Sequence, residues 1–381
     1  MKFYTIEGNH KSIFKTFAIY YICMVAFCVV RILASIGVFP QNTFGEITTS
    51  LIIQIGILFL LPLILYSYML KEKPKDVFEI CNFNSCNFKV ILISFGLGII
   101  CFLINIAVSS LFNGILVFAG YEFPVGSGSA DPSTITIWDF FKDVILVAVF
   151  PAFCEEFLHR GIVLQGTKHM GFKKAIVISS LLFALLHLNI QQVSYAFVVG
   201  LILGFVAVIT KNIFPAIIIH FTNNLISTYV DYAQIKNWFM GDMLTGLQTW
   251  LINTSPILIF FASLFAIACI IGLLCLFIWL LYKQSIVLKV NKAVDEAYNS
   301  HNFMSKENGP ILLNRDEIFK DVIENCTLLN LEHKKTDSPI DMVMPKEKSR
   351  YKMIKRDKIF MWCAIILGAL ITFFTYVWGL F

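Results

Sequence analysis

Ionisable side chains inside apolar segments are the first candidates for chemistry in this sequence. Charged groups are expensive in lipid, so each one within an apolar run is a functional hypothesis. Such groups gather in the segments 144–165, 173–189 and 213–232, and Arg31 is the one other charge well inside an apolar window. Together with neighbours at helical spacing, the candidates are Glu155, Glu156, Arg160, Phe183, His187, His220 and Asn224.

Helical spacing assigns these side chains to faces. Residues four apart lie on one face of a helix, which pairs Glu156 with Arg160 and His220 with Asn224. Glu155 and Glu156 diverge by about 100° and cannot face one site equally well. An unpaired carboxylate at that depth would be neutralised, so we interpret Arg160 as the partner that keeps Glu156 charged. Glu155 is then expected to face a wet cavity.

The depths of four candidates allow them to meet. Counted at about 1.5 Å per residue from flanking charges, Glu155, His187, His220 and Asn224 all lie near the middle of a hydrocarbon core about 30 Å thick. A carboxylate, two imidazoles and an amide around water are suited to hydrolysis, in which the carboxylate takes a proton from water and donors stabilise the oxyanion. Alternatively, Glu155, His187 and His220 are the ligands of one catalytic zinc ion. The sequence contains no HExxH motif and does not decide between the two.

Composition indicates the elements that must position these groups. Of the 381 residues, 57% are hydrophobic and only 14% are charged, which excludes an ordinary soluble domain. Windows long enough to span a bilayer occur at 13–38, 47–70, 90–119, 144–165, 173–189, 191–210, 213–232, 256–282 and 359–380. We therefore predict an all-α polytopic membrane protein with about nine transmembrane helices, of which the fourth to seventh form the catalytic core.

Basic residues predict the topology. Lys and Arg collect in alternate loops, which places the N-terminus in the cytoplasm and the C-terminus outside, in an integral multi-pass protein of the cell membrane. Only Leu188–Ile190 separates the fifth window from the sixth, and an error there would reverse everything downstream. The net charge of +5 is spread over loops, so membrane lipid is an expected partner and nucleic acid is not.

Five regions follow from these windows. They are N-terminal helices at 1–143, the catalytic core at 144–232, an outer loop and eighth helix at 233–282, a cytoplasmic polar insertion at 283–358, and a C-terminal helix at 359–381. We interpret the insertion as a solvated linker, with a docking domain as the alternative. Gly200 and Gly204 form a GxxxG pattern, which predicts close helix packing.

Three motifs carry a family resemblance. EExxxR at 155–160, FxxxH at 183–187 and HxxxN at 220–224 follow in that order on separate predicted spans. In this they resemble the CPBP family, the CAAX proteases and bacteriocin-processing enzymes, also termed the Abi family. The resemblance covers roughly 144–230 and implies an intramembrane endopeptidase similar to the type II CAAX prenyl endopeptidases. Its substrates would be membrane-associated or lipidated peptides or proteins.

The resemblance also implies roles for single residues. Glu155 matches the glutamate that activates water, His187 the histidine that helps hold the water, and His220 with Asn224 the pair assigned to the oxyanion. Glu156, Arg160 and Phe183 complete the motifs. The family is commonly labelled as metalloproteases, so a zinc ion stays an open alternative.

Two other classes use the same residue types. In a proton-coupled transporter Glu155 would carry the proton, and Glu156 and Arg160 would form a structural pair. A non-catalytic immunity or scaffold protein would keep the motifs for packing. His159, one turn after Glu155, is interpreted as an interfacial histidine near the inner headgroups, with an extra polar contact at the site as the alternative. The sequence does not indicate the substrate, its side of entry or the oligomeric state.

Overall fold

A computed structural model of the protein describes residues 6–122, 134–236, 264–286 and 355–378, with isolated positions at 238, 239, 241, 246 and 353. Throughout these residues the regular elements are helical and no strand is present. The elements are α1 (Ile6–Ser35), α2 (Thr43–Leu51), η1 (Ile52–Leu60), α3 (Leu61–Leu70), α4 (Pro74–Ile80), α5 (Phe88–Phe118), α6 (Ile137–Asp143), η2 (Val144–Val149), α7 (Phe150–Glu156), η3 (Phe157–Val163), α8 (Leu164–Thr167), η4 (Lys168–Met170), α9 (Phe172–Leu186), α10 (Ile190–Thr210), α11 (Phe214–Lys236), a helix at Leu264–Ile286, and α16 (Lys355–Trp378). The segments η1, η2 and η3 are π-helical, whereas η4 is a 3₁₀ turn.

The helices follow the nine apolar windows. Every window falls on a helix or on a run of consecutive helical segments, except that residues 256–263 lie outside the described part of the chain. The fourth window is longer than predicted, because Thr136 caps a helix that begins at Ile137. The boundary between the fifth and sixth windows is confirmed: Leu188 adopts a positive φ of 51°, and the Asn189 side chain caps α10. The protein is therefore an all-α polytopic membrane protein.

Six of the described helices are long and apolar enough to cross a membrane. The other three predicted spans are the ones that carry the motifs. One of them is divided into short α and π segments between Ile137 and Thr167, α9 has only 15 residues, and α11 contains a polar stretch at 220–224. Polar residues and irregular helix geometry thus concentrate where the sequence places the chemistry, as is common at functional sites.

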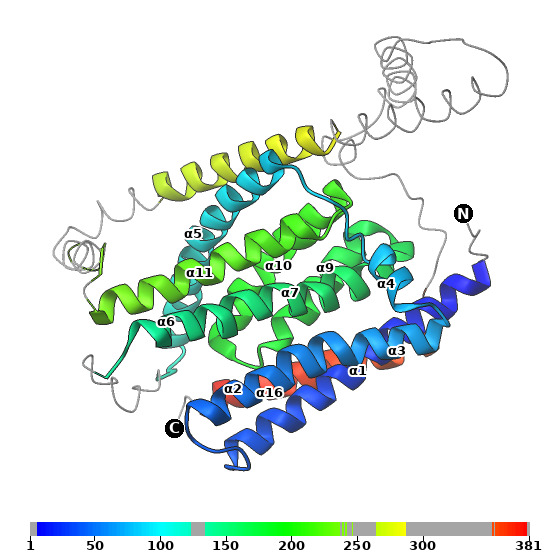
Figure 1. Ribbon diagram of the computed structural model, residues 1–381, viewed down its shortest axis with the longest axis horizontal. Coiled ribbons are helices and arrows are strands. Elements are labelled where there is room, and N and C mark those ends of the chain that lie inside the picture. The colour runs from blue at the N-terminus through cyan, green and yellow to red at the C-terminus, as the bar shows by residue number, and fades with distance from the viewer. Residues whose placement is uncertain are drawn as a thin grey trace, which may run out of the picture.

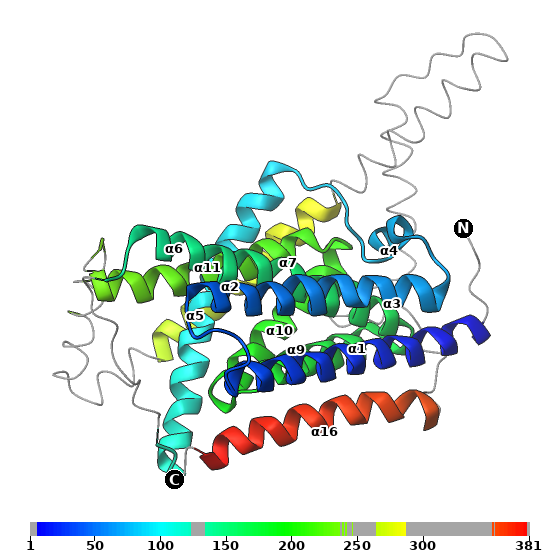
Figure 2. The same ribbon diagram turned by 60° about the horizontal axis from the view of Figure 1, so that its bottom comes forward.

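The motif-bearing helices occupy the middle of the bundle (Figure 1). On one side lie α1, α2, α3 and α16, and on the other lie α5 and the helix Leu264–Ile286. In the core, α9 packs against α10, while α11 packs along α5. Turning the molecule shows α16 on the outside of the bundle beside α1 (Figure 2). The core is consequently shielded by helices from both ends of the sequence.

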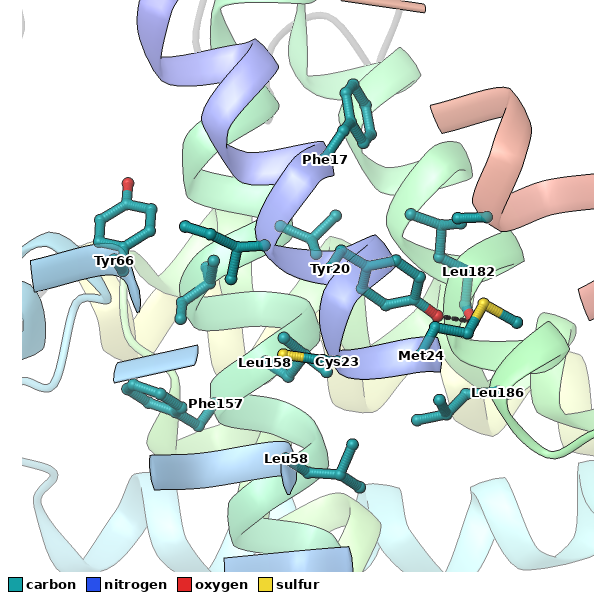
Figure 3. Packing of buried hydrophobic residues seen from close by; sticks show 14 of the residues in the cluster. Phe17, Tyr20, Cys23, Met24, Leu58, Tyr66, Phe157, Leu158, Leu182 and Leu186 are labelled. Atoms are coloured by element: carbon teal, nitrogen blue, oxygen red, sulfur yellow. Dashed lines mark hydrogen bonds between the residues drawn. The ribbon is translucent and has the colours of Figure 1, made fainter. Parts of the chain in front are cut away.

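Helix contacts in this bundle depend on small residues and on backbone acceptors. A Cβ atom added to Gly200 would come 3.1 Å from Cβ of Ser180, and one added to Gly204 would come 3.1 Å from Cγ2 of Ile176. The predicted close packing is therefore confirmed, and it joins α10 to α9. In the first buried cluster, the Tyr20 hydroxyl donates to the Leu182 carbonyl at 2.7 Å and links α1 to α9 (Figure 3).

Two predicted regions lie mostly beyond the described residues. The polar insertion 283–358 is described only at its two ends, and the outer loop 233–255 only at its start and at a few single positions.

Candidate active site

A buried ion pair forms the centre of the motif region. Arg160 Nη1 donates to Glu156 Oε1 at 2.8 Å, and both side chains are fully buried, as the i,i+4 spacing predicted. Arg160 Nη2 donates to the Gly200 carbonyl at 3.0 Å, and the guanidinium lies 4.5 Å from the centre of the Phe183 ring. Nδ1 of His220 lies 3.0 Å from the same Glu156 oxygen. A buried carboxylate stays ionised only when it is paired in this way, so we assign Glu156 a structural role.

Glu155 faces a different environment. Its side chain is half-buried and lines a cavity of about 790 Å³ between α1, α2, η1, α7 and the junction of α9 with α10. His187, Arg31 and Gln54 line the same cavity. The different orientations of Glu155 and Glu156 follow from their adjacency on one helix, because neighbouring residues diverge by about 100°. The geometry agrees with the predicted division between one carboxylate that faces a cavity and one that is paired.

His187 is oriented by its own helix. Its Nδ1 lies 3.0 Å from the carbonyl oxygen of Phe183, one turn earlier in α9. A carbonyl can only accept, so Nδ1 carries a proton, and Nε2 is the ring nitrogen whose lone pair is available when the ring is neutral. Phe183 is the common neighbour of three imidazoles, with ring centroids at 5.1 Å from His159, 5.0 Å from His187 and 5.6 Å from His220.

The HxxxN residues lie behind the cavity wall. His220 is turned toward Glu156, and neither His220 nor Asn224 is among the cavity-lining residues. Asn224 Nδ2 donates to the Val147 carbonyl at 3.0 Å, and Val147 itself lines the cavity. The Asn224 side-chain oxygen accepts from Asn223 at 2.9 Å. The structure therefore places Glu155 and His187 on the cavity and His220 and Asn224 one layer away.

The interpretation of His159 as an interfacial histidine is wrong. The side chain is fully buried, and its ring packs edge-on against Tyr20 with centroids 5.7 Å apart. Its Nδ1 lies 2.7 Å from the backbone oxygen of Glu155, so the contact between these residues, which the sequence allowed as the alternative, involves the backbone and not the carboxylate. The error arose because α1 covers this face of the helix, and no local pattern reveals a distant covering helix.

Sequence reasoning missed Gln54. Its Nε2 donates to Glu155 Oε1 at 3.3 Å, and both side chains line the cavity. Gln54 belongs to η1, far from the motifs in sequence, and its signal is that of a lone amide within the apolar stretch Leu51–Leu65. Arg31, noticed as an isolated charge, is brought by α1 to the same cavity.

The proposed zinc ligands do not form a set in this structure. Among the residues that it describes, no group of three or more His, Cys, Asp or Glu side chains lies close enough to hold a metal ion. The reason is geometric: Glu155 and His187 face the cavity, whereas His220 faces Glu156. The residues therefore do not fit a three-ligand metal centre, and we derive no reaction step through one.

The fold and the site define a polytopic integral membrane protein. In the middle of its helix bundle, one glutamate is paired with an arginine and its neighbour faces a cavity. Residues 137–226 match the family model described as type II CAAX prenyl endopeptidase Rce1-like. This match, over about a quarter of the chain, supports an assignment to the CPBP or CAAX protease family. It begins at α6 and ends within α11, so it includes all three motifs but neither Gln54 nor Arg31. Comparisons with curated proteins and with solved structures gave no match.

Proposed function

We propose that this protein is an intramembrane endopeptidase in which Glu155 activates water for attack on a peptide bond. The observation that carries the proposal is that Glu155 and His187 share one cavity while Glu156 is buried and neutralised by Arg160. A general base must reach solvent and substrate, and Glu155 meets that condition. The Rce1-like domain supports the same class of reaction.

The water is held between two acceptors. Glu155 takes one proton from it, and the Nε2 lone pair of His187 accepts the second hydrogen, because Nδ1 is occupied by the Phe183 carbonyl. The deprotonated water oxygen then attacks the peptide carbonyl carbon, which forms a C–O bond and moves the negative charge to the carbonyl oxygen; collapse of this oxyanion breaks the C–N bond. Protonated Glu155 subsequently gives its proton to the leaving amine, which completes hydrolysis and restores the carboxylate.

Gln54, which donates to Glu155 in the same cavity, is assigned as the donor for the oxyanion. One N–H of its amide points to Glu155 Oε1, which leaves a second N–H available next to the position of the water. Donors aimed at the developing negative charge typically contribute about 10²–10³ to kcat. His220 and Asn224, to which the resemblance assigns the oxyanion, would act here by positioning, through Glu156 and through the cavity wall at Val147.

The cavity suggests the type of substrate. Its volume of about 790 Å³ accommodates a short peptide segment and not a folded domain. Arg31 supplies a cation in the lining, suited to a carboxylate of that peptide, while the lining carboxylate of Glu46 is paired with Lys142 at 2.7 Å. The proposal therefore favours membrane-associated or lipidated peptides that present an acidic group to the cavity.

The direction of substrate entry follows from the proposed topology. Residues of the connection between α1 and α2 line the cavity, and this connection contains no Lys or Arg, in contrast to the Lys-rich connection after α3. With the N-terminus in the cytoplasm, the cavity belongs to the external half of a cell-membrane protein. Substrates would reach Glu155 from that side.

A peptide-cleavage assay tests the proposal. Purified protein in detergent is incubated with a library of unmodified and lipidated peptides, and Glu155→Gln is compared with wild type. Glu79→Gln, at an exposed carboxylate outside the cavity, is the matched control. We expect cleavage by wild type and by the control, no cleavage by Glu155→Gln, and no effect of a metal chelator. Cleavage by Glu155→Gln would refute the mechanism, and one tightly bound zinc per chain with reversible loss of activity would overturn its metal-free form.

A further inference from the structure

A second cavity lies at the membrane end at which α9 and α16 begin. It has a volume of about 650 Å³ and is bordered by Lys173 and Lys174 from the start of α9 and by Lys358 from the start of α16. It shares no residue with the cavity of Glu155. The motif chemistry does not use it, so it calls for an explanation of its own.

The charged residues that line this cavity, within the described part of the chain, are basic. Three of these lining residues are lysines and none of them is acidic. Asp357, next to Lys358, is fully buried and is not a lining residue, while the guanidinium of Arg356 lies 4.6 Å over the Phe14 ring. Two helices of 15 and 24 residues begin here, and their N-terminal ends add positive potential. The arrangement favours an anion.

The remaining lining is apolar. Met170, Val177, Ile178 and Met353 complete the cavity, and Val177 is 48% exposed. In a membrane bundle an exposed valine near the start of a spanning helix meets acyl chains. A free inorganic anion would use only the lysines, whereas a ligand with a phosphate next to hydrocarbon would use both halves.

The position of the cavity places it within reach of lipid. α16 packs against α1 and α9 on the outside of the bundle (Figure 2), so the cavity between α9 and α16 lies at the periphery of the described bundle, next to the core residue Met170. Lysines at the first turn of spanning helices lie at headgroup level, because the apolar part of each helix follows directly. Basic pockets of this type between membrane helices bind anionic headgroups.

We propose that this cavity binds one anionic phospholipid, with the headgroup phosphate held by Lys174 and Lys358 and the glycerol and upper acyl chain against Met170, Val177 and Met353. The lipid would join α16 to α9, the helix whose other end carries His187. The site is independent of the proposed protease activity, since none of its residues belongs to the motifs.

Binding is measured on the full-length protein in a neutral detergent, by thermal stability and by native mass spectrometry during titration with dioleoyl phosphatidylglycerol. Dioleoyl phosphatidylcholine and inorganic phosphate are the comparison ligands. The test variant is Lys174→Gln with Lys358→Gln. The matched control is Lys75→Gln with Lys89→Gln, which removes two exposed lysines from the first turns of α4 and α5, outside the cavity.

We expect wild type and the control to retain phosphatidylglycerol in preference to phosphatidylcholine. A lysine near an anionic surface contributes about fivefold to binding, so the double variant should bind about 30-fold more weakly. Lys174→Arg with Lys358→Arg should restore binding, which separates charge from folding. Equal binding of the two lipids by wild type would overturn the proposal. So would a loss of phosphatidylglycerol binding in the control variant as large as in the test variant, or saturation of the site by inorganic phosphate alone.

Discussion

The two adjacent glutamates should respond differently to the same substitution. In Glu156→Gln the buried Arg160 keeps its contacts to the Gly200 carbonyl and to Phe183 but loses its counter-charge. Breaking a buried pair by removing one partner typically costs about 3–5 kcal/mol. Glutamine still offers an oxygen to Arg160, so we expect a loss near the lower limit, about 3 kcal/mol.

Glu155→Gln should leave stability nearly intact. The half-buried carboxylate makes one side-chain hydrogen bond, to Gln54 at 3.3 Å, and glutamine can still accept it. A net change below about 1 kcal/mol is expected from one such hydrogen bond. Cleavage should nevertheless be abolished, because an amide cannot take the proton from water.

The assay combines thermal unfolding in detergent with peptide cleavage well below the unfolding midpoint. A double variant, Glu156→Gln with Arg160→Gln, is the internal control, because removing both charges avoids an unpaired one. It should be more stable than Glu156→Gln alone. Equal midpoints for the two single variants, or full activity of Glu155→Gln, would refute the assignment of structural and catalytic roles.

Three further predictions concern residues outside this pair. Gln54→Leu should lower kcat by about 10²-fold with little change in KM, whereas Gln54→Asn should recover part of the rate; an unchanged kcat would remove Gln54 from the mechanism. Gly200→Ala should lower the unfolding midpoint in detergent, because the added Cβ would lie 3.1 Å from Ser180 and shift the Gly200 carbonyl that accepts a hydrogen bond from Arg160. An unchanged midpoint would show that α10 accommodates the methyl group without loss of stability. Cysteines introduced at Gln41 and Glu79 should differ in intact cells, with an impermeant thiol reagent labelling only Gln41→Cys, and the reverse pattern would invert the proposed topology.

Local spacing determined much of the architecture. Apolar runs of spanning length predicted the helices, and the positive φ of Leu188 occurs where the sequence placed the most critical break. The Glu156–Arg160 pair and the contact of Phe183 with His187 were also predictable. All these contacts join residues four apart on one helix, and the 3.6-residue period of the helix fixes them before any tertiary packing.

Tertiary structure decided how the helices meet. It turned His220 toward Glu156, brought Gln54 to Glu155, and covered His159 with α1. Each of these contacts joins different helices, so it depends on their rotation and crossing, which many side chains determine together. Several of the acceptors are backbone carbonyls, such as those of Gly200 and Val147, and every residue type supplies that group. The sequence alone therefore named most of the chemical groups, whereas the packing of the bundle determined which of them face the cavity.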